Sequence, residues 1–315
     1  MNKVEKLAKL VLLDCLELQP QQSVLLVSEV KQTHAALAFQ SVAAKAHVEL
    51  LSLALVERPN GEPRLSALTR NVIQAAELAV IILPKLDQAS LTWLRQQNRT
   101  QVIVFSQIDD EAAWPSLETD QRQLRDRSRK LADILTIGRT LQLTTSNGTA
   151  LKMSITQNRG SAEMIPLLPE TYFASLPLGR AFVTPVFNSV EGTIMAESLA
   201  GSPASVASPF TLKVAAGKLT LIKGGKTAHE LRRRLRLAGT NARMVVEVGV
   251  GLNEKARLGC GEFEDEKVLG TVHLGFGRIV SGSKTPEIFA RSILPAPSVM
   301  IDGKKIIEDG KILFG

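Results

Sequence analysis

The sequence is poor in cysteine and in aromatic residues. Cys15 and Cys260 are its only cysteines, and aromatic side chains make up 4% of the 315 residues. The two cysteines lie far apart and lack Cys-x-x-Cys spacing, which excludes a thiolate zinc site and a disulfide framework. With so few aromatic side chains, a folded core must consist mainly of aliphatic residues.

Long apolar runs are also missing. No stretch approaches the roughly 18 apolar residues that a membrane span needs. The first residues, MNKVEKLAKLVLLDCLEL, carry acids and lysines within their apolar pattern, which is unlike a secretory signal. We therefore predict a cytoplasmic protein without a membrane partner.

The charge balance is basic but carries no nucleic-acid motif. The net charge is +7, from 38 basic and 31 acidic residues, which favours anionic partners in general. Four of the arginines lie in HELRRRLRL (229–237), whose spacing is typical of a solvated helix face. We expect no nucleic-acid partner.

Residues 1–115 alternate between helical patterns and short apolar runs. The runs SVLLV (23–27), LAVIIL (78–83) and QVIVF (101–105) are continuously apolar, as in strands that are covered on both faces. This rhythm predicts a doubly wound parallel α/β domain. No Gly-x-Gly-x-x-Gly turn follows the first run, so a dinucleotide site lacks its usual phosphate-binding turn.

The pattern changes after a helix expected at 116–137, which would link two domains. Residues 138–315 contain short strand-like segments separated by turn signals such as Asn147–Gly148 and the Asp-Gly pairs near the end of the chain. The fold class predicted for the chain is therefore α/β, with a mainly β (α+β) second domain.

The stretch Glu247–Gly277, EVGVGLNEKARLGCGEFEDEKVLGTVHLGFG, combines acids, a lysine and a histidine with seven glycines. Its ends are expected to be strands, because they are apolar and β-branched. Carboxylates and an imidazole on neighbouring strands are typical of a metal or acid–base site. The alternative is that EDEK is a solvated turn and His273 a hydrogen-bonded core residue.

Four segments resemble the aminopeptidase T-like (M29-type) family of metallopeptidases. They are NGTALKMSI (147–155), LPLGRAFVTPVFNSVEGTI (176–194), the Glu247–Gly277 stretch and PSVMIDGKKIIEDGKIL (297–313). The resemblance covers residues 138–315, whereas the first third matches only in architecture. It implies a catalytic-type domain that also forms a homodimer.

The resemblance also implies a site for two metal ions, most of whose ligands are absent here. Glu247 and His273 match a glutamate and the histidine of the family pattern. Arg180 stands where the family has its first glutamate, and Val280 stands where it has a catalytic tyrosine. Phe289 and Arg291 fall at the later His-x-Asp pair, within a residue or two of register.

Arginine in place of a carboxylate opposes metal binding and favours anions, because its planar fork suits carboxylate or phosphate. We therefore expect a ligand-binding group without a metal or other cofactor. Its members are Arg180, Glu247, Lys267, His273 and Arg291. An alternative of equal weight is that the arginines only form salt bridges with Glu247.

The resulting functional prediction is a non-peptidolytic relative of aminopeptidase T. It would bind a peptide or amino-acid-like anion, as an accessory in peptide modification. The alternative is a working enzyme with rearranged ligands around a divalent metal, either an aminopeptidase or a ring-cleaving iron dioxygenase. A purely structural homodimer is a third hypothesis, since a fold alone does not decide function.

Overall fold

The computed structural model describes residues 3–56, 65–84, 86–106, 108, 111, 114–165, 172–200, 209–239, 241–279 and 286–314. The chain divides into two compact units. The first contains residues 1–121 and 164–178, and the second contains residues 122–163 and 179–315. A search of the described residues finds no helix that is long and apolar enough to cross a membrane.

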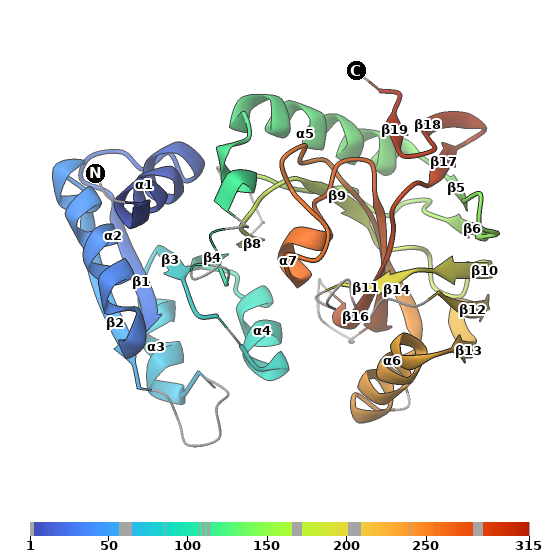
Figure 1. The fold of residues 1–315 in the computed structure, drawn as a ribbon, viewed down its shortest axis with the longest axis horizontal. Coiled ribbons are helices and arrows are strands. Elements are labelled where there is room, and N and C mark those ends of the chain that lie inside the picture. Colours follow the sequence, from blue (N-terminus) through green and yellow to red (C-terminus); the bar gives the residue numbers. More distant parts are fainter. Residues whose placement is uncertain are drawn as a thin grey trace. The chain divides into compact units, whose positions relative to one another are not determined.

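The first unit is built on a parallel sheet, as predicted (Figure 1). Its strand order is β2 (Glu49–Leu55), β1 (Ser23–Glu29), β3 (Leu78–Ile81), β4 (Gln101–Val104) and β8 (Phe173–Ser175), and every neighbouring pair is parallel. The central strands are buried over almost their whole length, which explains their continuous apolar sequence.

Helices precede and connect these strands. They are α1 (Lys3–Lys9), which continues as a π-helix over Leu10–Cys15, α2 (Thr33–Lys45), α3 (Ala67–Ala75) and α4 (Gln88–Arg95), with short 3-10 turns at Val30–Gln32 and Trp114–Glu118. Polar side chains begin two of them. Ser66 accepts a hydrogen bond from the Thr69 amide, and Asp87 accepts one from the Ser90 amide, so each helix has an N-cap.

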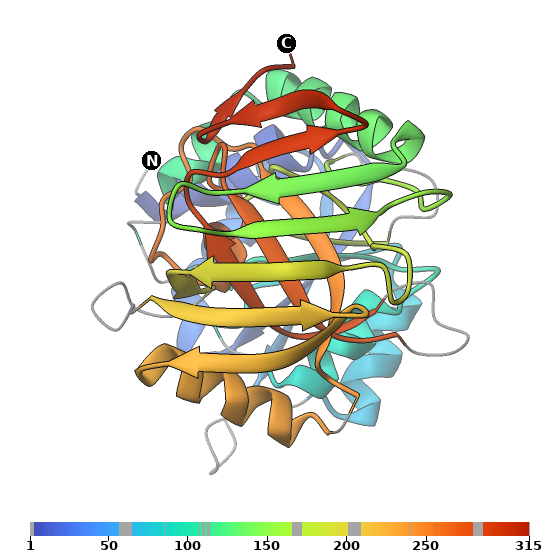
Figure 2. The ribbon, with the colours of Figure 1, turned by 90° about the vertical axis from the view of Figure 1, so that its right-hand side faces the viewer.

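The second unit contains one large antiparallel sheet. Its order is β11 (Ser198–Leu199), β16 (Glu287–Leu294), β15 (Val272–Arg278), β14 (Met244–Gly251), β13 (Lys218–Gly224), β12 (Phe210–Ala215), β10 (Glu191–Ala196), β6 (Ala150–Ser154), β5 (Thr140–Thr144), β17 (Ser298–Ile301), β18 (Lys304–Glu308) and β19 (Lys311–Ile312). Figure 2 shows much of this order, from the red C-terminal strands through green and yellow to orange. The mainly β second domain and the overall α/β class are therefore confirmed.

Among the described residues, two short strands and three helices complete the second unit. β9 (Arg180–Val183) pairs with β14 on one side and with β7 (Ser161–Glu163) on the other. The helices are α5 (Gln121–Ile137), α6 (Lys226–Leu237) and the single-turn α7 (Glu262–Asp265). β14 thus contacts three strands, and this brings residues from β7, β9, β15 and β16 around its centre.

Asp-Gly pairs form the last hairpin turns, as their sequence predicts. Asp302 and Gly303 have φ of 49° and 82°, and Asp309 and Gly310 have φ of 46° and 80°. Two successive residues with positive φ are typical of type I′ turns, whose twist matches that of the strands they join.

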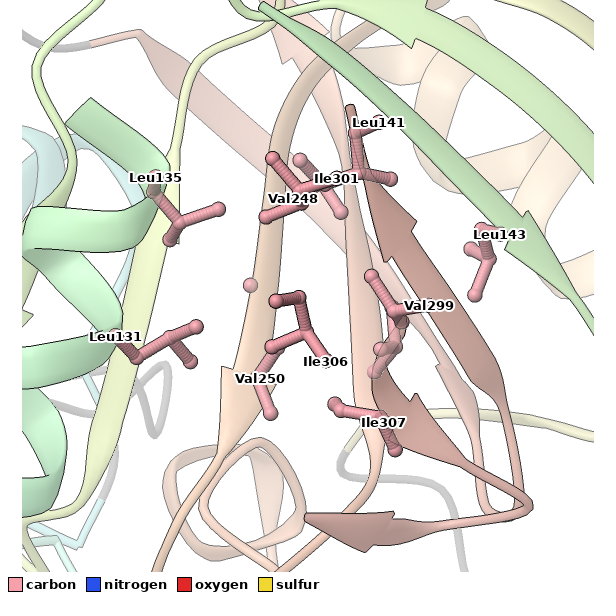
Figure 3. Close-up of a pocket in the computed structure, with 12 residues that line it drawn as sticks. Leu131, Leu135, Leu141, Leu143, Val248, Val250, Val299, Ile301, Ile306 and Ile307 are labelled. Carbon is pink, nitrogen blue, oxygen red and sulfur yellow. The ribbon is translucent and has the colours of Figure 1, made fainter. Parts of the chain in front are cut away.

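A small cavity lies among aliphatic side chains of the second unit (Figure 3). Its volume is about 10 Å³, which is room for at most one water. Its lining comes from α5, β5, β14, β15, β17 and β18: Leu131, Leu135, Leu141, Leu143, Val248, Gly249, Val250, Val272, Val299, Ile301, Ile306 and Ile307. It belongs to the packed core and is not a ligand pocket.

Candidate functional site

Charged side chains from six segments meet inside the second unit, beside the centre of β14. We call the following set the buried charge cluster: Glu163 from β7, Arg180 from β9, Glu247 from β14, Glu266 and Lys267 after α7, His273 from β15 and Arg291 from β16. Strand pairing fixes these positions. Arg180 is opposite Glu163 on one strand pair, and Glu247, Gly275 and Arg291 lie in one row across three strands.

Arg180 is at the centre of the cluster. Its Nε donates to Glu163 Oε2 at 2.9 Å. Its Nη1 lies 3.0 Å from Glu247 Oε1, 3.2 Å from Glu266 Oε2 and 3.3 Å from His273 Nε2. A single nitrogen atom is therefore within hydrogen-bond distance of two carboxylates and an imidazole.

Arg291 contacts the same two carboxylates. Its Nε lies 3.1 Å from Glu247 Oε1 and 2.9 Å from Glu266 Oε2. Its Nη1 reaches Glu262 Oε1 at 3.3 Å, and the Glu262 side chain is 41% exposed. Arg291 thus connects the buried carboxylates to the protein surface.

Lys267 pairs with Glu266 and shares an oxygen of Glu163 with Arg180. Its Nζ lies 3.0 Å from Glu266 Oε1 and also contacts Glu163 Oε2. The Lys267 side chain is fully buried, so its charge needs these partners.

The buried charge cluster is electrically balanced. All seven residues are at most 5% exposed. The carboxylates of Glu163, Glu247 and Glu266 are matched by the side chains of Arg180, Lys267 and Arg291, so three negative charges meet three positive ones. Charges buried away from water persist only when they are paired in this way. The EDEK segment is therefore not a solvated turn.

Two glycines make room for the cluster. A Cβ at Gly249 would lie 2.3 Å from His273 Nε2, and a Cβ at Gly275 would lie 2.9 Å from Glu247 Cβ. Any side chain at these positions would displace the imidazole or the carboxylate. These two glycines of the Glu247–Gly277 stretch thus allow side chains on neighbouring strands to approach each other closely.

Electrostatics fix the protonation states. Burial alone would raise the pKa values of Glu163, Glu247 and Glu266, but the neighbouring buried cations outweigh it and lower all three pKa values. Burial lowers the pKa of His273, although the hydrogen bond and charge of Glu247 oppose the change. At neutral pH the carboxylates are ionised and the imidazole is neutral.

Three members of the cluster form a candidate metal-binding group. One ligand atom each from Glu247, Glu266 and His273 lies within 4.8 Å of the others, and all three residues are buried. His273 Nδ1 is also buried and has no hydrogen-bond partner among the described residues. Ionised carboxylates and neutral imidazole are the forms in which these side chains bind metals.

The five residues that the sequence predicts for the site lie together in the structure: Arg180, Glu247, Lys267, His273 and Arg291. Phe289 is not part of this group; its ring lies 5.5 Å from the Arg278 guanidinium. Val280 lies outside the described residues. Sequence analysis missed Glu163 and Glu266, and only the acidic character of EDEK pointed to the latter.

A family model described as NicX: 2,5-dihydroxypyridine 5,6-dioxygenase matches residues 4–276, which is most of the chain. The chain belongs to the NicX family. No curated protein sequence matches it.

Two solved structures share the fold of this NicX-family chain. A 2,5-dihydroxypyridine dioxygenase from Pseudomonas putida KT2440 aligns with a TM-score of 0.77 and 18% identity, over 99% of this chain and 97% of that chain. Wild-type AmpT from Thermus thermophilus aligns with a TM-score of 0.72 and 14% identity, over 99% of each chain. The expected aminopeptidase T-like fold is thereby confirmed.

The family match corrects the predicted function. A metal-free, non-peptidolytic relative of aminopeptidase T is the wrong description, because the matching family is one of dioxygenases. The prediction of no cofactor is also corrected. A dioxygenase family implies iron, and Glu266 supplies a third donor beside the two positions, Glu247 and His273, that sequence analysis had identified.

The donors of the NicX-family chain fit iron in type. Carboxylate oxygen and imidazole nitrogen are donor types that bind iron, but this set has two carboxylates and one imidazole, where the facial triad of non-haem iron oxygenases has one carboxylate and two imidazoles. Arg180 Nη1 lies within 3.3 Å of all three donor atoms, and Arg291 Nε lies 3.1 and 2.9 Å from the two carboxylate oxygens among them. A metal on these three atoms would need both nitrogens to move away.

Proposed function

We propose that this chain is a ring-cleaving dioxygenase that acts on a hydroxylated nitrogen heteroaromatic ring. The observation that carries the proposal is the match of residues 4–276 to a family model described as a 2,5-dihydroxypyridine 5,6-dioxygenase. The buried group of Glu247, Glu266 and His273 supports it, because the residues that would hold an iron ion lie together within the matched segment.

Bound iron would supply the redox chemistry that molecular oxygen needs in order to react with an aromatic ring. The protein's part is to hold the metal in a buried position and to keep its ligands deprotonated. The lowered pKa values of Glu247 and Glu266 meet the second requirement, since both carboxylates are ionised at neutral pH.

The cations of the cluster suit an anionic substrate. Iron would add two positive charges to a cluster in which three carboxylates already balance three cations. A dihydroxylated ring that has lost its hydroxyl protons would restore that balance. Arg291 is placed to hold such an oxygen, because a guanidinium donates charge-assisted hydrogen bonds to anionic oxygen.

Substrate would reach the cluster beside Glu262. Arg291 Nη1 contacts this carboxylate, and the Glu262 side chain is the half-exposed end of an otherwise buried chain of ion pairs. Opening the pair between Arg291 and Glu262 would expose Arg291, which contacts both Glu247 and Glu266.

The test is oxygen consumption by iron-loaded protein with 2,5-dihydroxypyridine as the probe. The protein is loaded with ferrous iron without air, and oxygen uptake and loss of the ring absorbance are followed together. We expect both signals to depend on added iron and to stop with a chelator. Iron-loaded protein that consumes no oxygen with this or related hydroxypyridines would contradict the proposal.

Two variants separate the site from the rest of the protein. Glu266→Gln removes one donor charge while keeping the side-chain size, and should abolish both signals. Glu230→Gln is the matched control, because Glu230 also pairs with arginines but lies on α6 and faces Arg233 and Arg234. Equal activity in the two variants would remove Glu266 from the site.

A further inference from the structure

Arg180 Nη1 lies in the position where a metal would bind. It is 3.0, 3.2 and 3.3 Å from the candidate ligand atoms of Glu247, Glu266 and His273. Bonds from metals to carboxylate oxygen or imidazole nitrogen are about 2.0–2.2 Å long. A metal bonded to the same three atoms would be in contact with this nitrogen, and both carry positive charge. The two cations exclude each other.

Arg180 has contacts that would remain if Nη1 moved away from the three donors. Its Nε is bonded to Glu163 Oε2 at 2.9 Å, and its guanidinium lies 4.4 Å from the centre of the Phe182 ring. Neither contact involves a candidate metal ligand. The side chain can therefore turn its Nη1 away while keeping a carboxylate and an aromatic face as partners.

Arg291 contacts two of the three candidate ligands, the carboxylates of Glu247 and Glu266. Its Nε contacts Glu247 and Glu266, and its Nη1 contacts Glu262. The guanidinium of Arg180, by contrast, also lies 3.3 Å from His273 Nε2. Arg180 is thus the cation that contacts all three donors, whereas Arg291 contacts the two carboxylates alone.

We propose that Arg180 is a built-in competitor for the metal: it holds the three donors together in the metal-free protein and must leave them for a metal to bind. This inference rests on the proposed function, because it concerns the same metal centre. Metal affinity is then set by the difference between metal coordination and the Arg180 contacts, and a neutral side chain at position 180 should raise it.

The experiment measures cobalt(II) binding to metal-free protein by visible absorbance and by competition with a coloured chelator. Arg180→Gln should bind cobalt about ten-fold more tightly or better, which corresponds to the loss of one charge-assisted hydrogen bond. Without metal the variant should melt at a lower temperature than wild type, and cobalt should raise its melting temperature by more than it raises that of wild type. Arg278→Gln is the matched control, since Arg278 pairs with Glu287 and lies over Phe289.

The outcomes separate this inference from the proposed function. If wild type and Arg180→Gln bind cobalt equally, the competitor role is wrong and the metal centre stands. If only the variant binds cobalt, the competitor role is supported and the wild-type dioxygenase proposal fails. If neither binds, both fail. Should Arg180→Gln not fold without metal, it is refolded with cobalt present, which must restore its fold; a variant that stays unfolded with cobalt would overturn the proposal.

Discussion

Lys267 allows the strongest test of the charge balance. Its fully buried Nζ neutralises part of two carboxylates, those of Glu163 and Glu266. Lys267→Met keeps the length and apolar stem of the side chain but leaves three carboxylates against two arginines. Removing one partner of a buried ion pair usually costs about 3–5 kcal/mol, because the other charge stays buried without compensation. We expect a loss of free energy of unfolding of that size.

The double variant Glu163→Gln/Lys267→Met restores neutrality. Glu163→Gln alone should also cost about 3–5 kcal/mol, since it leaves one positive charge in excess. The double variant should lose much less than the sum, below about 3 kcal/mol, because neutral replacement of a whole buried pair is often close to neutral in stability.

The assay must report on the second unit. Trp93 and Trp114 are the two tryptophans and both lie in the first unit, so their fluorescence does not report on the cluster. Hydrogen exchange of amides in β14 and β15, measured in increasing urea, follows the second unit directly. Single variants that each lose less than about 1 kcal/mol, or a double variant that loses the full sum, would refute the charge-balance argument.

Three further predictions concern Gly249, Glu247 and Gly270, all in the second unit. Gly249→Ala should destabilise the protein by about 1–3 kcal/mol and weaken metal binding, because its Cβ would meet His273 Nε2 at 2.3 Å; unchanged melting and cobalt affinity would contradict this. Acid should destabilise the second unit as pH falls below the ordinary glutamate pKa of 4.5, because Glu247 binds a proton more readily when unfolded; a flat stability profile from pH 5 to pH 3 would contradict it. Gly270→Ala should cost at least about 2 kcal/mol in urea unfolding, because φ is +78° and its Cβ would meet the Gly310 carbonyl oxygen; a smaller loss would mean that this turn adapts.

The fold could be predicted from local sequence patterns. Continuous apolar runs such as 78–83 indicated strands covered on both faces, and β3 is a buried parallel strand. The Asp-Gly pairs at 302–303 and 309–310 indicated hairpin turns, and both have positive φ. These features depend on neighbouring residues, so the sequence displays them directly.

The site could be predicted only in part, because its contacts join distant segments. Glu247 and His273 stood out as an acid and a histidine on strands bounded by glycines. Glu266 did not, because an acidic run resembles a solvated turn unless the buried cations opposite it are known. Its partner Arg180 lies 86 positions away along the chain, a separation that no local pattern spans.

The sequence left two interpretations of the arginines open, and the structure shows the salt bridges from both arginines to Glu247 that one of them expected. The other interpretation was that Arg180 and Arg291 oppose metal binding, since positive charge repels a dication. The structure shows that both are already neutralised by carboxylates, so their charges alone do not decide metal binding. What matters is whether one guanidinium can leave, and no sequence pattern gives that information.

The most direct test of the metal centre is a crystal structure of protein loaded with ferrous iron without air, with iron located by its anomalous scattering. We predict an iron peak bonded to Glu247, Glu266 and His273, with the Arg180 guanidinium turned away and still paired with Glu163. An iron-soaked crystal without a peak at these three residues, with Arg180 Nη1 still among them, would contradict the account.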